Sequence, residues 1–186
     1  MRPLKRISPF LVAGLLAFNV SVAHGSNASD ACAESLTNGS GDTSLQEVGS
    51  TRLRVLLFRV YDAALYSPSG RYDDPEERLL RLNYLRNFSA SQLVEQTRDE
   101  WERLGFDLDD QANAWLETLA QMWPDVERGQ CLVAHARDEY GTSFYGSEGY
   151  LGTIESDTFS DQFLAIWLSE NARYRSSRDE LVGASR

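Results

Sequence analysis

The sequence contains almost no lysine and very little histidine. Lys5 is its single lysine, and His24 and His135 are its two histidines in 186 residues. It also lacks a Gly-x-Ser-x-Gly motif, a glycine-rich phosphate loop and any cluster with metal-ligand spacing. These absences argue against a hydrolase, a nucleotide-binding enzyme and a metalloenzyme, so the sequence predicts no cofactor and no metal site. We interpret His135 as a histidine packed within a strand.

The chain is also short of basic charge. It has 28 Asp and Glu against 18 Lys and Arg, which gives a net charge of −10. If residues 1–23 are removed, 15 basic side chains remain, all of them arginine, and the net charge becomes −13. Nucleic acids and anionic membrane surfaces are therefore poor partners for the body of this acidic protein. Two explanations of the lysine-free composition stay open: work in high or variable salt, and codon usage in a GC-rich genome.

Residues 1–23 have the pattern of a secretory signal peptide. Basic residues at positions 2, 5 and 6 precede the mostly apolar residues 7–22, and small residues precede a cleavage position after Ala23. Cleavage after Gly25 is the second choice, and an uncleaved anchor is the alternative, although the apolar run is short for a membrane span. This pattern predicts a periplasmic or secreted protein.

After the signal, the composition predicts one linker and one domain. Residues 24–43 are polar with little to bury, so they are predicted to be a disordered linker. Residues 44–186 are predicted to form a single domain without a membrane span. Cys32 lies in the linker and Cys131 in the domain, and an even cysteine count in an exported chain suggests a disulfide between them. Closing so long a loop is worth about 4.7 kcal/mol in the chain-entropy model.

Residues 49–66 are the densest β-forming run in the sequence. From residue 58 onward, side chains alternate between two faces, with Tyr61 and Asp62 on opposite sides. Arg52, Arg54 and Arg59 interrupt this apolar run, and a guanidinium in a sheet must reach water or an anion. We hypothesise that Arg52 or Arg54 faces inward to bind an anion. Pairing with surface acids at a strand end is the alternative.

The rest of the chain predicts further strands and four helices. Strands are expected at residues 78–88, 131–136, 141–145 and 150–154. Ser89 and Gln92 form a capping box for a helix that ends at Gly105. Further helices are expected from residue 109 or 110 to 122, from 156 or 157, and over 177–182. This order predicts an α+β open-faced sandwich, with an antiparallel sheet covered on one face by helices.

Five short motifs occur in a consistent order and spacing. They are Gly49-Ser50-Thr51-Arg52, Phe58-Arg59-Val60-Tyr61-Asp62-Ala63-Ala64-Leu65-Tyr66, Ser89-Ala90-Ser91-Gln92-Leu93, Gly152-Thr153-Ile154 and Phe163-Leu164-Ala165-Ile166-Trp167-Leu168. With these motifs the chain resembles the bacterial chalcone isomerase-like proteins over about residues 45–181. The resemblance implies an antiparallel sheet with helices packed over it and a ligand cleft between them.

The resemblance also implies a range of activities. Plant chalcone isomerases close a flavanone ring with an arginine on an early strand, aided by threonine, tyrosine and asparagine. Related plant proteins keep the arginine and a tyrosine, lack the isomerase reaction and bind fatty acids. Exported bacterial members look non-catalytic as a group.

Position by position, this sequence departs from the isomerases. Arg52 matches the family arginine, with Arg54 as the alternative, and Tyr61 stands at the place of the threonine. Ala90 stands where the isomerases have tyrosine, and Thr97 where they have asparagine. Each lost hydrogen-bond donor is worth about 3 kcal/mol in the transition state. We therefore predict no chalcone isomerisation.

The leading hypothesis is an exported, non-catalytic protein that binds a fatty acid or a similar apolar carboxylate. Arg52 or Arg54 with Tyr61 would hold the carboxylate, and a helix stripe containing Thr97 and Trp101 would face the acyl tail. One alternative is an intramolecular lyase or isomerase acting on an enone-like substrate. The other is a protein-interaction module of the cell envelope. The sequence indicates neither the ligand nor the oligomeric state.

Overall fold

Six antiparallel strands form one sheet in which neighbours in the chain are neighbours in space. The computed structural model describes residues 45–73 and 76–184. The strands are β1 (Gln46–Val55), β2 (Phe58–Ser67), β3 (Glu77–Tyr84), β4 (Cys131–Arg137), β5 (Gly141–Gly146) and β6 (Gly149–Ile154). This is the antiparallel meander that the sequence predicts for residues 131–154, extended to the whole sheet.

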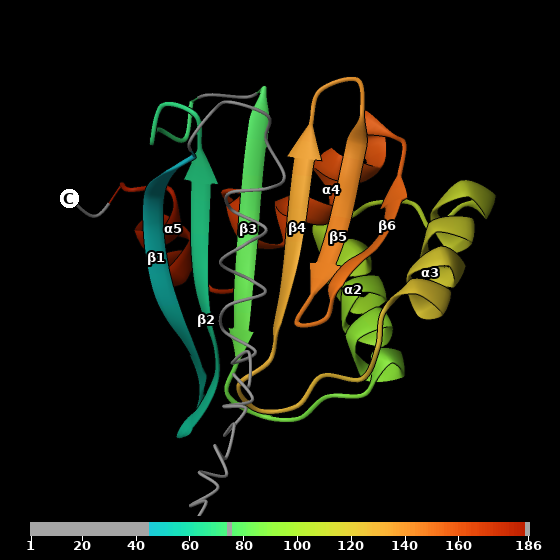
Figure 1. The fold of residues 1–186 in the computed structure, drawn as a ribbon, viewed down its shortest axis with the longest axis horizontal. Coiled ribbons are helices and arrows are strands. Elements are labelled where there is room, and N and C mark those ends of the chain that lie inside the picture. Colours follow the sequence, from blue (N-terminus) through green and yellow to red (C-terminus); the bar gives the residue numbers. More distant parts are fainter. Residues whose placement is uncertain (1–44, 74–75, 185–186) are drawn as a thin grey trace, which may run out of the picture.

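Helices cover one face of this sheet (Figure 1). They are α2 (Ala90–Leu104), α3 (Asp110–Met122), α4 (Asp157–Leu168) and α5 (Arg175–Leu181). In Figure 1, α5 lies behind β1 and β2, α4 lies behind β4 and β5, and α3 lies beyond β6. The predicted α+β architecture, an antiparallel sheet covered on one face, is therefore confirmed.

Capping residues set the helix boundaries, and the capping box at Ser89 is the one that the sequence predicts. The Ser89 hydroxyl accepts a hydrogen bond from the Gln92 backbone N–H, and the Gln92 side chain accepts one from the Ser89 backbone N–H. Gly105 ends α2 with a φ of 84°, in the left-handed region that glycine adopts without strain. Asp109 and Ser156 cap α3 and α4 through their side chains. Because these caps are local, the sequence alone places three helices correctly.

The run at residues 49–66 is two strands and not one segment. The chain turns at Leu56 and Leu57, whose exposed fractions are 89% and 96%. Leu56 has a φ of 56°, which costs a non-glycine residue on the order of 1–2 kcal/mol. No glycine, asparagine or proline marks this turn, so the usual hairpin signal is missing from the sequence.

Two predicted boundaries also shift. The ladder of β3 ends at Tyr84, and only an isolated bridge between Phe88 and Val126 continues the expected strand at residues 78–88. The last helix begins at Arg175, two residues before the expected start.

Strand alternation decides which side chains face the helices. On β2, Tyr61, Ala63 and Leu65 belong to the main core beneath the helices, whereas Ala64 and Tyr66 belong to a smaller cluster with residues of β3 and β4. This confirms the two-faced pattern expected for residues 58–66. Large aromatic side chains then fill the core on the helix side: Trp101, Trp115, Trp123, Phe144, Phe159 and Phe163.

The contact between α5 and β1 requires a glycine. A Cβ atom on Gly49 would lie 2.1 Å from the Glu180 carbonyl oxygen and 2.7 Å from that of Leu181. Both atoms belong to the backbone, so neither can rotate away. The helix therefore packs on β1 closely enough to exclude even a methyl group.

We expect the substitution Gly49→Ala to lower the free energy of unfolding by about 2 kcal/mol or more, because α5 must separate from β1. Gly146→Ala is the matched control, since its Cβ atom would meet only Leu151 side-chain atoms at 3.5 Å or beyond. Urea unfolding of both variants measures the difference. Equal stability of the two variants would show that α5 does not depend on this close approach.

His135 is fully buried on β4 beside an acid. Its Nε2 atom lies 2.6 Å from Glu77 Oε1, and its Nδ1 atom has no partner among the residues that the structure describes. Burial lowers the pKa of His135 below its ordinary 6.5, although the bond to Glu77 opposes this effect. The placement agrees with the interpretation of His135 as a packed histidine.

The lowered pKa of His135 predicts a pH-dependent stability. The unfolded chain takes up a proton near pH 6.5, whereas the folded protein resists it, so the free energy of unfolding falls as the pH drops through 6.5. We expect a His135→Gln variant to show a smaller fall between about pH 7.5 and 5.5. Urea unfolding over this range measures both slopes, and identical slopes would contradict the assignment.

Candidate functional site

A cavity of about 580 Å³ lies between the sheet and the helices. Its walls come from β1 to β5, from α2, α4 and α5, and from the loop between α4 and α5. The deep wall is mostly apolar, and its members include Leu53, Leu80, Leu82, Leu93, Leu132 and Phe163. The volume falls within the range of ligand pockets for small molecules.

The rim of the cavity is polar and exposed. Gln92 and Gln96 of α2 lie on one side, and Arg173 and Tyr174 of the α4–α5 loop lie on the other. Val55, at the end of β1, also lines the cavity and is 38% exposed. The cavity therefore combines an apolar interior with a polar rim, as expected for a ligand that has one polar end.

Two tyrosines place hydroxyl groups at this cavity. The Tyr61 and Tyr84 rings pack edge to face with centroids 6.0 Å apart, and both line the cavity. The Tyr61 hydroxyl accepts a hydrogen bond from Trp167 Nε1 at 2.9 Å. Burial raises the pKa of both tyrosines far above their ordinary value, so both stay neutral. Neither hydroxyl donates to a protein acceptor among the described residues, and each keeps a proton to offer.

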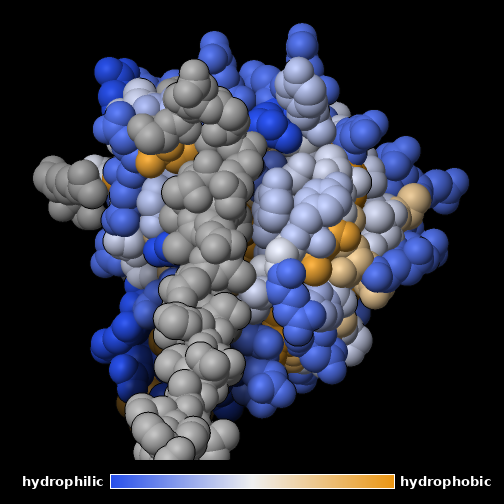
Figure 2. Space-filling model, in the orientation of Figure 1, coloured by the Kyte–Doolittle hydropathy of each residue, from blue (hydrophilic) through white to orange (hydrophobic). Residues whose placement is uncertain are grey.

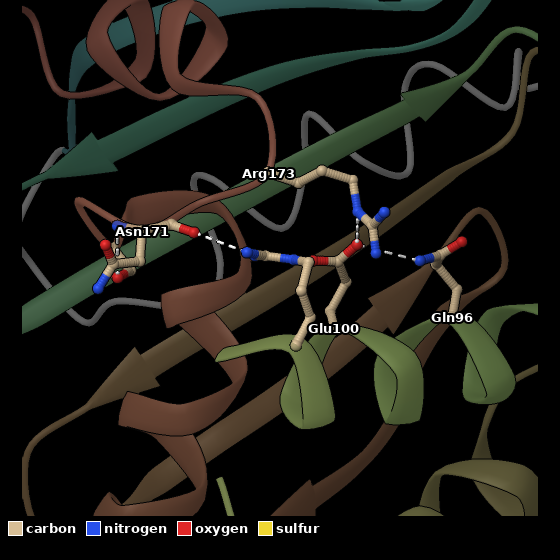
Figure 3. A network of polar contacts seen from close by, with 6 residues as sticks. Gln96, Glu100, Asn171 and Arg173 are labelled. Carbon is tan, nitrogen blue, oxygen red and sulfur yellow. Dashed lines mark hydrogen bonds and ion pairs between the residues drawn. The ribbon is translucent and has the colours of Figure 1, made fainter. Parts of the chain in front are cut away.

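A buried carboxylate, that of Glu100, lies close enough to Tyr61 to raise the pKa of its hydroxyl. Figure 3 shows the polar contacts of this carboxylate. Glu100 of α2 has a side chain that is 6% exposed, and it accepts hydrogen bonds from Arg103 at 2.7 Å and Arg173 at 2.5 Å. Gln96 donates a third at 3.2 Å. Arg103 also donates to the Asn171 carbonyl oxygen at 2.8 Å. These bonds fasten α2 to the α4–α5 loop at the rim of the cavity.

Arg52 and Arg54 do not line the cavity. Both are exposed, while the alternate residues Thr51 and Leu53 face inward. Arg52 forms a two-point ion pair with Asp62 across the hairpin, at 2.5 and 2.8 Å. The bond from Arg52 holds the pKa of Asp62 below its ordinary value. The hypothesis that one of these guanidinium groups faces inward is therefore wrong, because strand alternation turns both outward. For Arg52, the structure shows the alternative, an ion pair with an acid.

The other predicted residues divide between the cavity and the core. Tyr61 and Thr97 line the cavity, although the Thr97 hydroxyl donates to the Leu93 carbonyl oxygen of its own helix at 3.0 Å. Trp101 does not line it, because its ring is fully buried and its N–H donates to the Gln162 carbonyl oxygen. Trp101 therefore packs α2 against α4, a correction to its expected contact with an acyl tail. Ala90 also lies outside the lining residues, at the first turn of α2.

Sequence reasoning missed the polar residues at the rim. Arg173 and Tyr174 follow α4 in a loop without periodicity, so no pattern singles them out. Glu100 does leave a signal, because it interrupts the apolar stripe of α2 between Thr97 and Leu104. An acid on a buried stripe indicates a partner of opposite charge.

Several predicted features bear on function without belonging to this cavity. Cys32 and the signal sequence lie outside the described residues, and the disulfide to Cys131 stays a prediction. Cys131 itself is buried at the start of β4, where its backbone N–H donates to Ser147 Oγ at 3.1 Å. Within residues 45–73 and 76–184, no group of acidic, histidine and cysteine side chains is arranged to hold a metal ion. No helix in the described ranges is long and apolar enough to span a membrane.

Comparisons with known proteins identify relatives of this fold. The family model described as chalcone isomerase-like matches residues 29–183. A crystal structure of a fatty-acid binding protein from Arabidopsis thaliana superimposes with a TM-score of 0.60 at 13% sequence identity. The match covers 78% of this chain and 90% of that chain. At this identity the likeness shows a shared fold. No curated protein matches the sequence.

Removing the Glu100 carboxylate is expected to destabilise the protein. We expect Glu100→Ala to lower the free energy of unfolding by about 2 kcal/mol, less than the 3–5 kcal/mol of a fully buried pair, because Arg173 is 44% exposed. Glu102→Ala on the exposed face of α2 is the matched control and should change stability by less than about 0.5 kcal/mol. Thermal and urea unfolding measure both variants. A Glu100→Ala protein as stable as the control would mean that the cluster does not hold the loop.

Proposed function

Because the chain belongs to the chalcone isomerase-like family, we propose that it binds a fatty acid or a similar apolar carboxylic acid in the cavity between sheet and helices. The single observation that carries this proposal is the site itself, an apolar interior of about 580 Å³ that is also lined by Tyr61 and Tyr84 and has Arg173 at its rim.

The apolar interior suits an acyl tail. Leucine side chains from three strands, from α2 and from α5 line it, with Phe163 at the α4 side. Each methylene group that leaves water for such a surface gains about 0.8 kcal/mol. Affinity should therefore rise about fourfold for each added methylene until the cavity is full.

The rim supplies groups for a carboxylate. Arg173 uses its Nε atom to bind Glu100, and its two terminal nitrogens donate to no acceptor among the described residues. A guanidinium with two free N–H groups suits bidentate binding of a carboxylate. Tyr61 lies close to Glu100 and Tyr174, since both contribute to its electrostatic environment, and its O–H is free to donate. We therefore assign the anion-binding role to Arg173 with Tyr61, in place of Arg52 and Arg54.

The structural relative supports the same ligand class by analogy. The Arabidopsis thaliana protein with this fold is described as a fatty-acid binding protein. The signal-like residues 1–23 further suggest that the ligand is bound outside the cytoplasm, in the periplasm or the external medium.

Isomerase chemistry has less support from the site. Ala90 offers no side-chain donor and lies outside the cavity lining, and the Thr97 hydroxyl is engaged with its own helix. An enone-like substrate would find Tyr61 and Tyr84 as neutral donors but no oriented amide at the position of Thr97.

Titration with saturated fatty acids of increasing length and with the matching alcohols tests the proposal. We expect the acids to bind more tightly with length, and at least tenfold more tightly than the alcohols, because a hydrogen bond to a charged group is worth about 1.5–3 kcal/mol. The double variant Glu100→Gln, Arg173→Met removes the cation without leaving a buried acid unpaired, and it should bind acids and alcohols equally.

The variant Arg52→Ala, Arg54→Ala is the matched control, because both side chains lie outside the cavity. It should bind fatty acids as tightly as the original protein. No binding of any acid, or a loss of acid binding in this control alone, would overturn the proposal.

A further inference from the structure

The β1–β2 hairpin ends in an exposed apolar tip. Val55, Leu56, Leu57 and Phe58 are 38%, 89%, 96% and 56% exposed. The other large exposed apolar side chains of the described residues are three separate tyrosines. Figure 1 shows the hairpin reaching beyond the end of β3 at the lower left. Four consecutive apolar residues on a protruding tip are more than scattered surface residues and mark an interaction site.

The turn at the tip places a leucine in a backbone conformation that favours glycine. Leu56 has a φ of 56°, in a region where glycine or asparagine is free of strain. A glycine at this position would make the same turn more easily and would expose no apolar surface. The turn itself therefore does not require a leucine at this position.

Arginines lie directly behind the tip. Arg54 and Arg59 are cross-strand partners, so two like charges face each other, an arrangement that destabilises a hairpin unless an anion is near. The Arg86 guanidinium carbon lies 4.8 Å from the centre of the Phe58 ring. The acid that follows on β2, Asp62, is paired with Arg52 and also interacts electrostatically with Arg59, so one carboxylate is shared by two arginines. Strongly hydrophilic residues gather at the lower left of Figure 2, over this hairpin.

We propose that the tip, residues 55–58, inserts into an anionic membrane surface. The apolar side chains would enter the boundary of the acyl chains, and Arg54, Arg59 and Arg86 would contact lipid phosphates. This charge complementarity favours an anionic bilayer over an apolar pocket on another protein, which would leave three guanidinium groups unmatched. The chain without residues 1–23 has a net charge of −13 and is repelled by the same surface, so the protein is oriented with the tip toward the membrane.

The tip and the cavity belong to the same hairpin. Leu53, Val55 and Val60 line the cavity, and Val55 also belongs to the tip. Docking through the tip therefore brings the cavity rim close to the bilayer, where apolar acids partition. This role in loading rests on the proposed binding function, whereas docking itself does not.

Vesicle binding of the purified protein tests the docking. We expect it to co-sediment with vesicles of 30% phosphatidylglycerol in phosphatidylcholine, to bind pure phosphatidylcholine at least tenfold more weakly, and to lose affinity as salt rises. The double variant Leu56→Ser, Leu57→Ser should reduce binding at least tenfold, and so should the double variant Arg54→Ala, Arg59→Ala. Tyr140→Ser, Tyr150→Ser is the matched control, because these side chains are 64% and 62% exposed away from the tip, and it should bind normally.

A local probe separates the tip from the rest of the chain. In a Leu57→Trp variant, lipids with brominated acyl chains should quench the added emission, while Trp101, Trp115 and Trp123 are buried and little affected. Trp167 is only partly buried and lines the cavity, so the original protein gives the background quenching that is subtracted. Absence of quenching, or undiminished vesicle binding by the tip variants, would overturn the proposal. Fatty-acid titration of the tip variants without vesicles should give unchanged affinity. If the original protein binds vesicles but no fatty acid, the proposed binding function fails and the docking proposal stands.

Discussion

Strand alternation beneath a single layer of helices determines which side chains of this protein reach its cavity. Helices cover one face of the sheet, so a shift of one residue along a strand moves a side chain from the cavity to the opposite face. On β1 this places Thr51 and Leu53 inward and Arg52 and Arg54 outward. The irregular register between Leu53 and Arg54 then lets the end of the hairpin carry arginines on one side and cavity-lining valines on the other.

A second polar element closes the same site from the helix side. Glu100 is buried on α2, and its two arginine partners connect α2 with the loop between α4 and α5. One of these partners, Arg173, binds Glu100 through its Nε atom and lies at the rim with its two terminal nitrogens unbonded to the described residues. A buried acid thus positions the cation that lines the cavity, and the orientation of that cation depends on contacts between α2 and the α4–α5 loop, which are distant in sequence.

The sequence predicted what depends on local chemistry. The capping box at Ser89, the helix starts expected at residue 109 or 110 and at residue 156 or 157, and the alternation on β2 rest on neighbouring residues, so they were correct. The motifs also indicated the family, which the match over residues 29–183 confirms. The inward arginine was wrong because its face depends on register, and the turn at Leu56 was missed because its residues carry no turn signal. The pairing of Glu100 with Arg173 is a tertiary contact, and no local pattern in the loop indicates it.

The strict chain order of the sheet has a consequence for how the protein reaches its native state. β1, β2 and β3 pair through short connections, as do β4, β5 and β6, so each half of the sheet is a local unit. Only the pairing of β3 with β4 spans α2 and α3, and this long closure carries the largest entropic cost in assembling the sheet. During synthesis from the N-terminus, β1, β2 and β3 can therefore pair before β4, β5 and β6 have been made. Pairing of β3 with β4 is then the last step in assembling the sheet.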